Sequence, residues 1–184
     1  MPAVDLAREH LSAIDNMVAA RGLPKLVKMG VGGPAYVAAG LVGLARVELA
    51  GETYQPTPGG ELVYVQPVVE DDELIDLCAW LADHPDRWAL RLGVGFALGE
   101  DAIRAAMWPS AGPLPLHRTP LDWLRADCTG ACILRPADAW RELADFEAVV
   151  AENIDHGRAV EKMLTPPRWP RPKVLVRQAE GIAA

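Results

Sequence analysis

The chain has 184 residues, of which 51% are hydrophobic and 23% charged, and its formal net charge is −7. This is the composition of a globular protein with a sizeable core, which excludes extensive disorder. The acidic balance also excludes binding of nucleic acid over the whole surface, because proteins of that kind are usually basic. We expect a single domain over residues 1–184, with subregions 1–43, 44–82 and 88–177.

Membrane and export segments are not expected. No apolar run reaches the ~18 residues that cross a bilayer, and Asp5 and Glu9 stand where a signal peptide would be basic. The three cysteines are then reduced thiols. We therefore predict a cytoplasmic protein without membrane contact, and the sequence does not indicate its oligomeric state.

Charge is unevenly distributed along the chain. Residues 61–101 contain ten acids and two bases, whereas residues 162–177 contain five bases and no acid. Two interpretations are open. The two segments are a solvated acidic face and a solvated basic tail, or they form a local docking patch for phosphate or an acidic partner.

The N-terminal half is predicted to hold a helix and a small antiparallel meander. A helix over residues 2–21 carries an apolar stripe that we expect to face the body of the protein, formed by Ala7, Leu11, Ile14 and Val18. A glycine-rich loop over 25–43, with a short helix near 36–41, follows. Alternating and β-branched patterns predict strands over 44–50 and 62–69. Residues 74–80 fit either a helix or, as we favour, a third strand.

The C-terminal half alternates between predicted strands and helices. Residues 90–98 show the strictest alternation of bulky and small side chains, which indicates a strand. Further strands are predicted over 114–117, 130–135 and 173–177, and helices over 100–108, 120–126 and 137–164, the last with a break near 153–157. The fold class is therefore α/β or α+β, with a mostly parallel βαβαβαβ sheet and flanking helices over residues 88–177.

Polar side chains follow several of these strands. Ligands bind beyond the carboxyl ends of parallel strands, and that edge would collect Glu100, His117, Arg118, Arg135 and Asp138. Helices that begin there would add free N–H groups that favour an anion. In one interpretation the acids and the histidine are catalytic candidates and the two arginines bind an anion or phosphate. In the other, the acids only favour helix starts and the arginines lie on the surface.

The order of elements carries a resemblance to a known family. The βαβαβαβ order, with Glu100 closing the first strand, is similar to the toprim module of primases and topoisomerases over residues 90–177. In that family a glutamate after the first strand and an Asp-x-Asp pair after the third hold Mg²⁺. Glu100 matches the first position, whereas residues 135–138 read Arg-Pro-Ala-Asp where the pair would stand. The resemblance implies a degenerate relative that lacks the metal chemistry.

Other motifs give no complete site. Cys128 and Cys132 have the spacing of half a zinc site, but the four ligands of such a site are not evident. The glycine-rich loop around Gly32 lacks the Gly-Lys-Ser/Thr of a phosphate-binding loop. We predict no metal site and no cofactor, with Mg²⁺ entering only if the protein handles phosphate groups.

The basic segment near the C-terminus is a docking candidate. It is a stiff, proline-rich stretch that contains Arg168, Trp169, Arg171 and Lys173. An aromatic ring between arginines can stack on a base or dock on a protein, or the segment straps the last strand over the sheet. Together these observations predict a non-catalytic accessory or interaction protein that binds another protein and is associated with nucleic-acid replication or processing. The alternative is a phosphate- or nucleotide-handling enzyme with its site at the edge of the parallel strands.

Overall fold

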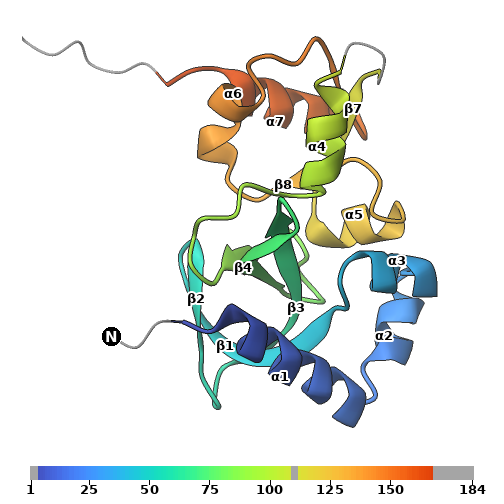
Figure 1. Cartoon of the computed structure of the whole chain (residues 1–184), viewed down its shortest axis with the longest axis vertical. Helices are drawn as coiled ribbons and strands as arrows, with labels where there is room; N and C mark the ends of the chain where they lie inside the picture. Colours follow the sequence, from blue (N-terminus) through green and yellow to red (C-terminus); the bar gives the residue numbers. More distant parts are fainter. Residues whose placement is uncertain (1–3, 109–111, 168–184) are drawn as a thin grey trace, which may run out of the picture.

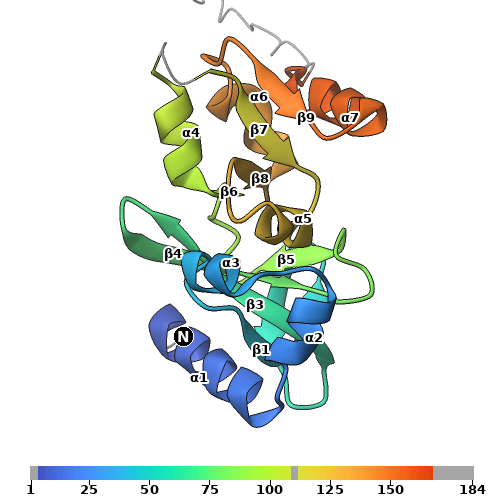
Figure 2. The same ribbon diagram turned by 90° about the vertical axis from the view of Figure 1, so that its right-hand side faces the viewer.

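The computed structural model describes residues 4–108 and 112–167 of the chain. Its helical elements are α1 (Leu6–Ala19), α2 (Leu23–Lys28), α3 (Gly33–Ala38), α4 (Glu100–Ala106), α5 (Pro120–Arg125), the 3-10 turn η1 (Pro136–Asp138), α6 (Ala139–Glu142) and α7 (Ile154–Leu164). Its strands are β1 (Gly43–Ala50), β2 (Thr53–Pro56), β3 (Glu61–Glu70), β4 (Glu73–Trp80), β5 (Trp88–Leu90), β6 (Ala97–Leu98), β7 (Leu114–His117), β8 (Ala131–Ile133) and β9 (Val149–Ala151). Figures 1 and 2 show two parts stacked along the long axis, with α1 at one end and α7 at the other.

The first part is a closed barrel with the strand order β1-β2-β5-β4-β3. Neighbouring strands are antiparallel, apart from β2 and β5, which run parallel with Thr53 opposite Leu90. Strands are present where we predict them over 44–50, 62–69 and 74–80, so the last segment is a strand rather than a helix. Closure into a barrel is not predicted, because β2 and β5 are too short to carry a periodic signal of their own.

An apolar core joins the barrel to the second part. Tyr64 and Trp80 stack inside this core with their ring centroids 4.7 Å apart, and the Trp80 indole donates a hydrogen bond to Gln66 at 2.9 Å. The same buried cluster includes side chains of β6 and β8. Trp88 of the barrel adds a polar link, because its indole N–H donates to the carbonyl oxygen of Leu134 at 3.1 Å. The two parts are therefore packed against each other through both apolar and hydrogen-bonded contacts.

The second part is a mixed sheet with the order β6-β8-β7-β9. Strand β7 is parallel to both β8 and β9, whereas β6 is antiparallel to β8. The predicted βαβαβαβ sheet is therefore wrong at its first strand and correct for the parallel pair of β7 and β8, whereas β9, the other parallel partner of β7, lies where we predict a helix. The predicted helix over 120–126 is present as α5, and Thr119 caps it by accepting a hydrogen bond from the backbone N–H of Asp122 at 3.1 Å.

The segment over residues 90–98 is not one strand. Only its ends pair, in β5 and β6, and between them the chain turns away from both sheets. The buried carboxylate of Asp76 accepts hydrogen bonds from the backbone N–H groups of Leu92 and Val94 at 2.8 Å and of Gly95 at 3.1 Å. These N–H groups bond to a side chain instead of a neighbouring strand. The alternating pattern here therefore belongs to a loop that Asp76 holds in place.

Helix α1 packs by a different face from the one that we predict. Ala13 and Met17 are buried against the barrel, whereas Leu11 is 63% and Val18 72% exposed. The reason is close approach: a Cβ atom on Gly43 would lie 2.5 Å from the backbone of Ala13, so only small residues fit at this contact. The stripe of Ala7, Leu11, Ile14 and Val18 is therefore turned largely away from the core.

Two further expectations differ from the structure. The glycine-rich segment forms two short helices, α2 and α3, rather than a loop with one helix. The long helix predicted over 137–164 is divided into η1, α6, β9 and α7, because β9 adds to the edge of the sheet beside β7. The predicted strand over 173–177 lies outside the described residues. Among the helices described here, none combines the length and the apolar character needed to cross a membrane.

Candidate functional site

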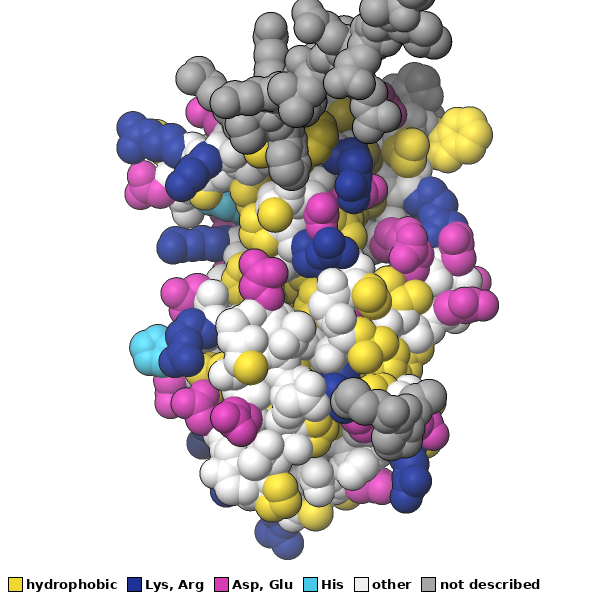
Figure 3. Space-filling view, turned by 90° about the vertical axis from the view of Figure 1, so that its left-hand side faces the viewer, with side chains coloured by type: hydrophobic (Ala, Val, Ile, Leu, Met, Phe, Trp, Pro, Cys, Tyr) yellow, Lys and Arg dark blue, Asp and Glu magenta, His cyan; other side chains and the backbone are white. Residues whose placement is uncertain are grey.

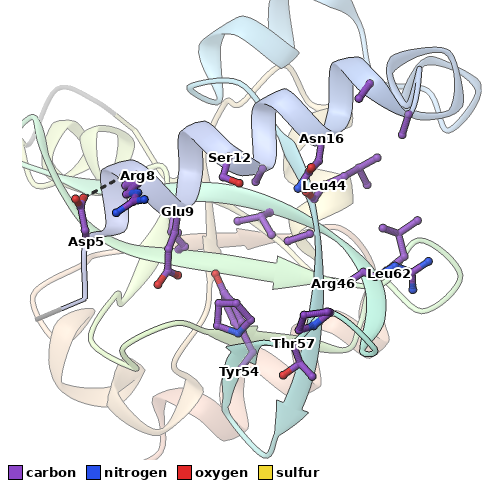
Figure 4. Close-up of a pocket in the computed structure, with 18 residues that line it drawn as sticks. Asp5, Arg8, Glu9, Ser12, Asn16, Leu44, Arg46, Tyr54, Thr57 and Leu62 are labelled. Atoms are coloured by element: carbon purple, nitrogen blue, oxygen red, sulfur yellow. Dashed lines mark hydrogen bonds between the residues drawn. The ribbon is translucent and has the colours of Figure 1, made fainter. Parts of the chain in front are cut away.

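A large hollow lies between α1 and the barrel (Figure 4). Its volume is about 1080 Å³, and we name it the α1 groove. Its walls come from α1, from β1 to β4 and from the turn after β2; the side chains labelled in Figure 4 are Asp5, Arg8, Glu9, Ser12, Asn16, Leu44, Arg46, Tyr54, Thr57 and Leu62. Glu9 from the helix and Tyr54 from β2 reach toward the same space in this view. The mouth of a small barrel is a common place for a binding site.

Local sequence features hold α1 in the position that leaves this groove. Asp5 caps the helix by accepting a hydrogen bond from a backbone N–H in the first turn at 3.0 Å. Glu9, one turn later, forms an ion pair with Arg91 at 2.8 Å. Near the middle of the helix, Ala13 rests on Gly43 of β1. The helix is thus fixed along its length before any ligand arrives, which lowers the ordering cost of binding.

The α1 groove has an apolar floor and a polar rim. Val65 and Leu77 of the barrel are buried at its floor, and Leu62 lines it with half of its surface exposed. On the rim, Asn16 and Arg46 donate hydrogen bonds to backbone carbonyl groups at 3.2 and 3.0 Å. These two side chains are therefore held in place, and the groove presents a fixed shape to solvent.

Tyr54 is the buried titratable side chain of the groove. Burial, followed by the negative charge of Glu9, raises the pKa of its phenol well above the ordinary value of 10.0. The phenol therefore stays neutral at physiological pH, where it can donate or accept a hydrogen bond but does not act as a base. The geometry of the groove suits binding by shape and hydrogen bonding.

The five residues that we predict at the strand ends do not meet in one place. Arg135 forms an ion pair with Asp138, three residues further on. Glu100 begins α4 and lies 3.5 Å from Arg104 of the same helix, which also binds Asp71 of the β3–β4 turn. Burial raises the pKa of the Glu100 carboxyl. These residues thus form local ion pairs at two separate positions.

His117 and Arg118 do lie together, at the end of β7, and Glu152 joins them. The Glu152 carboxylate lies 3.1 Å from Nδ1 of His117 and accepts from the backbone N–H of Arg118 at 3.4 Å. Its own backbone N–H donates to His156 at 3.2 Å. The last two residues are missed by sequence reasoning, because a single helix over 137–164 hides the end of β9. The usable signal is Asn153, a helix-capping residue type that marks where α7 begins.

The remaining predictions concern the cysteine pair, metal binding and the basic docking segment. Cys132 is fully buried in β8, and burial raises the pKa of its thiol. Over residues 4–108 and 112–167, no group of three or more histidine, cysteine, aspartate or glutamate side chains is placed to hold a metal ion. The predicted docking residues lie outside the described part of the chain, namely Arg168, Trp169, Arg171 and Lys173.

Comparisons of the chain with protein-family models, with curated proteins and with solved structures found no match. The resemblance of residues 90–177 to the toprim module therefore stays a prediction from the sequence.

Proposed function

We propose that this protein is a non-catalytic interaction protein whose α1 groove binds an extended segment of a partner protein. The observation that carries the proposal is the shape of the groove. Residues that line it run from Asp5, before the first turn of α1, to Ala20, after the last turn. At 1.5 Å per residue this length is about 22 Å, which exceeds what one small molecule fills.

The length of the groove matches a short extended segment. An extended segment rises about 3.3 Å per residue, so six or seven residues would fill the groove.

The walls define the chemistry of this partner segment. Alternate side chains of an extended segment point to opposite sides, so apolar side chains at every second position would pack on the floor. Both signs of charge stand on the rim, where Arg8 lies beside Asp5 and Glu9 at one end and Arg46 lies near Leu62 at the other. In Figure 3, acidic and basic side chains are likewise interspersed rather than separated over the face that it draws. The partner segment is therefore apolar on one side and carries few charges of its own.

The alternative function, a phosphate- or nucleotide-handling enzyme, needs the five strand-end residues in one pocket. Arg135 and Asp138 are instead paired with each other, away from Glu100. The association with nucleic-acid replication or processing comes from the resemblance to the toprim module and from the basic segment around Trp169, which lies outside the described residues, and it remains a prediction.

A peptide selection with a blocked variant tests the groove. A displayed library of random nine-residue peptides is selected on the wild-type protein alone, and the enriched peptides are then titrated against Ser12→Trp, which places an indole ring in the groove. The matched control is Asp15→Trp, an exposed position of the same helix that does not line the groove. Thermal unfolding of both variants shows that each is folded.

We expect selected peptides to bind the wild type and Asp15→Trp equally and to bind Ser12→Trp at least ~10-fold more weakly, which corresponds to ~1.4 kcal/mol. Amide chemical shifts along α1, β1 and β3 should change on binding. Failure to enrich any peptide would overturn the proposal, and so would peptides that bind Ser12→Trp as well as the wild type.

A further inference from the structure

A second, smaller cavity lies where the barrel meets the second part, at the carboxyl end of β7. Its volume is about 190 Å³, and we name it the β7 cavity. Trp88, Leu116, Ile133 and Met163 contribute apolar walls. The polar side chains that line it are those of Asp86, His117, Arg118 and His156. It lies where parallel strands β7 and β8 end and α7 packs over them, which is the usual position of a ligand in such sheets.

His156 presents a hydrogen-bond donor to this cavity. The residue is only 5% exposed, and its Nδ1 accepts a hydrogen bond from the backbone N–H of Glu152 at 3.2 Å. Burial is the main cause that lowers the pKa of the ring, so the ring is neutral and its proton resides on Nε2. Nε2 has no hydrogen-bond partner among the described residues. Among the described residues the buried side-chain atom without a partner is Nε2 of Gln66, so Nε2 of His156 keeps a little exposed surface, and a ligand in the cavity can accept its hydrogen bond.

The neighbouring histidine and glutamate already have partners. Both ring nitrogens of His117 are engaged, Nδ1 with Glu152 at 3.1 Å and Nε2 with the carbonyl oxygen of Thr129 at 2.9 Å. The Glu152 carboxylate is held by His117 and by the backbone N–H of Arg118. His117 therefore serves as part of the wall, and the groups that remain free to bind a ligand are His156, Arg118 and Asp86.

Arg118 and Asp86 bring one charge of each sign to the cavity. Both line it and both are solvent-exposed. Within the described parts of the chain, neither side chain takes part in an ion pair. A ligand with one negative and one positive group would complement both charges, and its remaining atoms would pack on the apolar walls.

We infer that the β7 cavity binds a small apolar α-amino acid as its zwitterion. Arg118 and the Nε2–H group of His156 receive the carboxylate, and Asp86 receives the ammonium group. The aliphatic side chain packs among Leu116, Ile133 and Met163. This inference does not depend on the α1 groove, because the two hollows have no lining residue in common.

Size and charge disfavour two other ligand classes. A cavity of about 190 Å³ is below the roughly 300–1,000 Å³ of sites for drug-sized ligands, so a nucleotide is too large. Inorganic phosphate is small enough, but its two negative charges would lie beside Asp86, and it has no apolar surface to match Trp88 and Met163. Inorganic phosphate is therefore included as a probe in the experiment that tests the inference.

Calorimetric titration of the full chain with four probes tests the inference. The probes are leucine, 4-methylpentanoate (carboxylate only), 3-methylbutylamine (ammonium only) and inorganic phosphate. We expect leucine to bind and each single-charge probe to bind roughly 10-fold or more weakly, since a hydrogen bond to a charged group contributes about 1.5–3 kcal/mol. Phosphate should give no saturable heat.

Charge variants identify which group binds which end. Arg118→Gln should weaken leucine and 4-methylpentanoate by roughly 10-fold and leave 3-methylbutylamine unchanged. Asp86→Asn should weaken leucine and 3-methylbutylamine and spare the carboxylate probe. The matched control is Arg158→Gln, an exposed arginine of α7 that does not line the cavity.

A spectroscopic measurement covers the case in which substitution of buried His156 prevents folding. In the wild-type protein, the ¹⁵N shift of Nε2 should change on addition of leucine while that of Nδ1 stays constant. The inference is overturned if leucine gives no saturable binding at about 10 mM. It is also overturned if phosphate binds as tightly as leucine, or if Arg118→Gln and Arg158→Gln behave alike.

Discussion

The carboxylate of Glu9 binds the guanidinium of Arg91 through two parallel hydrogen bonds, one to Nε at 2.8 Å and one to Nη2 at 3.0 Å. The two side chains are 28% and 11% exposed, so the pair is largely shielded from water. The side-chain hydrogen bond to Glu9 is the main cause that raises the pKa of Arg91. Because Glu9 belongs to α1 and Arg91 follows β5, this pair fixes the helix to the barrel at one end of the α1 groove.

Replacement of Arg91 by lysine should destabilise the protein although the charge is kept. Lysine cannot form both bonds at once, and we expect a loss of about 1–2 kcal/mol in the free energy of unfolding. Urea denaturation measures this loss, with Arg87→Lys as the exposed control. In a double-mutant cycle with Glu9→Gln, the two effects should be non-additive, and full additivity would contradict the assigned pairing.

Asp76 should be one of the most sensitive polar positions in the barrel. Its buried carboxylate accepts from the backbone N–H groups of Leu92, Val94 and Gly95 and also from that of Leu77. Asp76→Ala leaves these donors unpaired, and we expect a loss of at least ~3 kcal/mol. Hydrogen exchange at the three loop amides should accelerate, whereas the exposed control Asp83→Ala should change neither quantity.

An element of the fold can be predicted from sequence when local interactions stabilise it, and it cannot when its interaction partners lie far away in the chain. Thr119 and the residues after it predict α5 correctly, because a helix cap is a local interaction. The segment over 90–98 alternates as a strand does, but its backbone donors bond to Asp76, which lies well before it in the chain. No local pattern reports such a distant acceptor. Closure of the barrel by the short strand β5 is not predicted either, because the sequence of that strand does not report which distant strands it pairs with.

The residues of the candidate sites likewise divide into those that a local sequence signal predicts and those that depend on a distant part of the chain. His117 and Arg118 are predicted at the end of β7 and do line a cavity there, since a short strand before a capped helix is a local signal. Glu152 and His156 depend on β9, which is stabilised by pairing with β7 rather than by its own sequence. The α1 groove is not predicted, because it depends on which face of α1 meets Gly43.

Two glycines offer a matched test of the helix–barrel contact. A Cβ atom on Gly43 would lie 2.5 Å from the backbone of Ala13, whereas one on Gly59 meets nothing within 4 Å. Gly43→Ala should therefore push α1 away and cost about 1–3 kcal/mol. Gly59→Ala should leave the free energy of unfolding unchanged or raise it slightly. Equal effects of the two substitutions in urea denaturation would show that α1 does not pack closely at this point.

His156 should make the protein less stable as the pH falls below neutrality. Burial lowers the pKa of its ring from 6.5 in the folded state, against the opposing effect of Glu152. The unfolded chain then binds a proton that the folded chain does not, so the stabilisation present above pH 6.5 is lost as the pH decreases below it. His156→Gln should flatten the decline of Tm between about pH 7 and pH 5. The same substitution at the exposed His84 serves as control, and an equal flattening there would contradict the assignment.

The three cysteines should differ sharply in reactivity. Cys78 and Cys132 are fully buried, and burial raises the pKa of both thiols. Cys128 is half-buried, and burial followed by the charge of Asp127 raises its pKa from 9.0 to about 11. At pH 8 its thiolate fraction is then roughly 100-fold below that of a free thiol. A colorimetric disulfide reagent should therefore modify Cys128 slowly in the native protein and all three thiols rapidly in denaturant. Cys128→Ser should abolish the native reaction, and rapid labelling of a second thiol without denaturant would show that β4 or β8 is not buried.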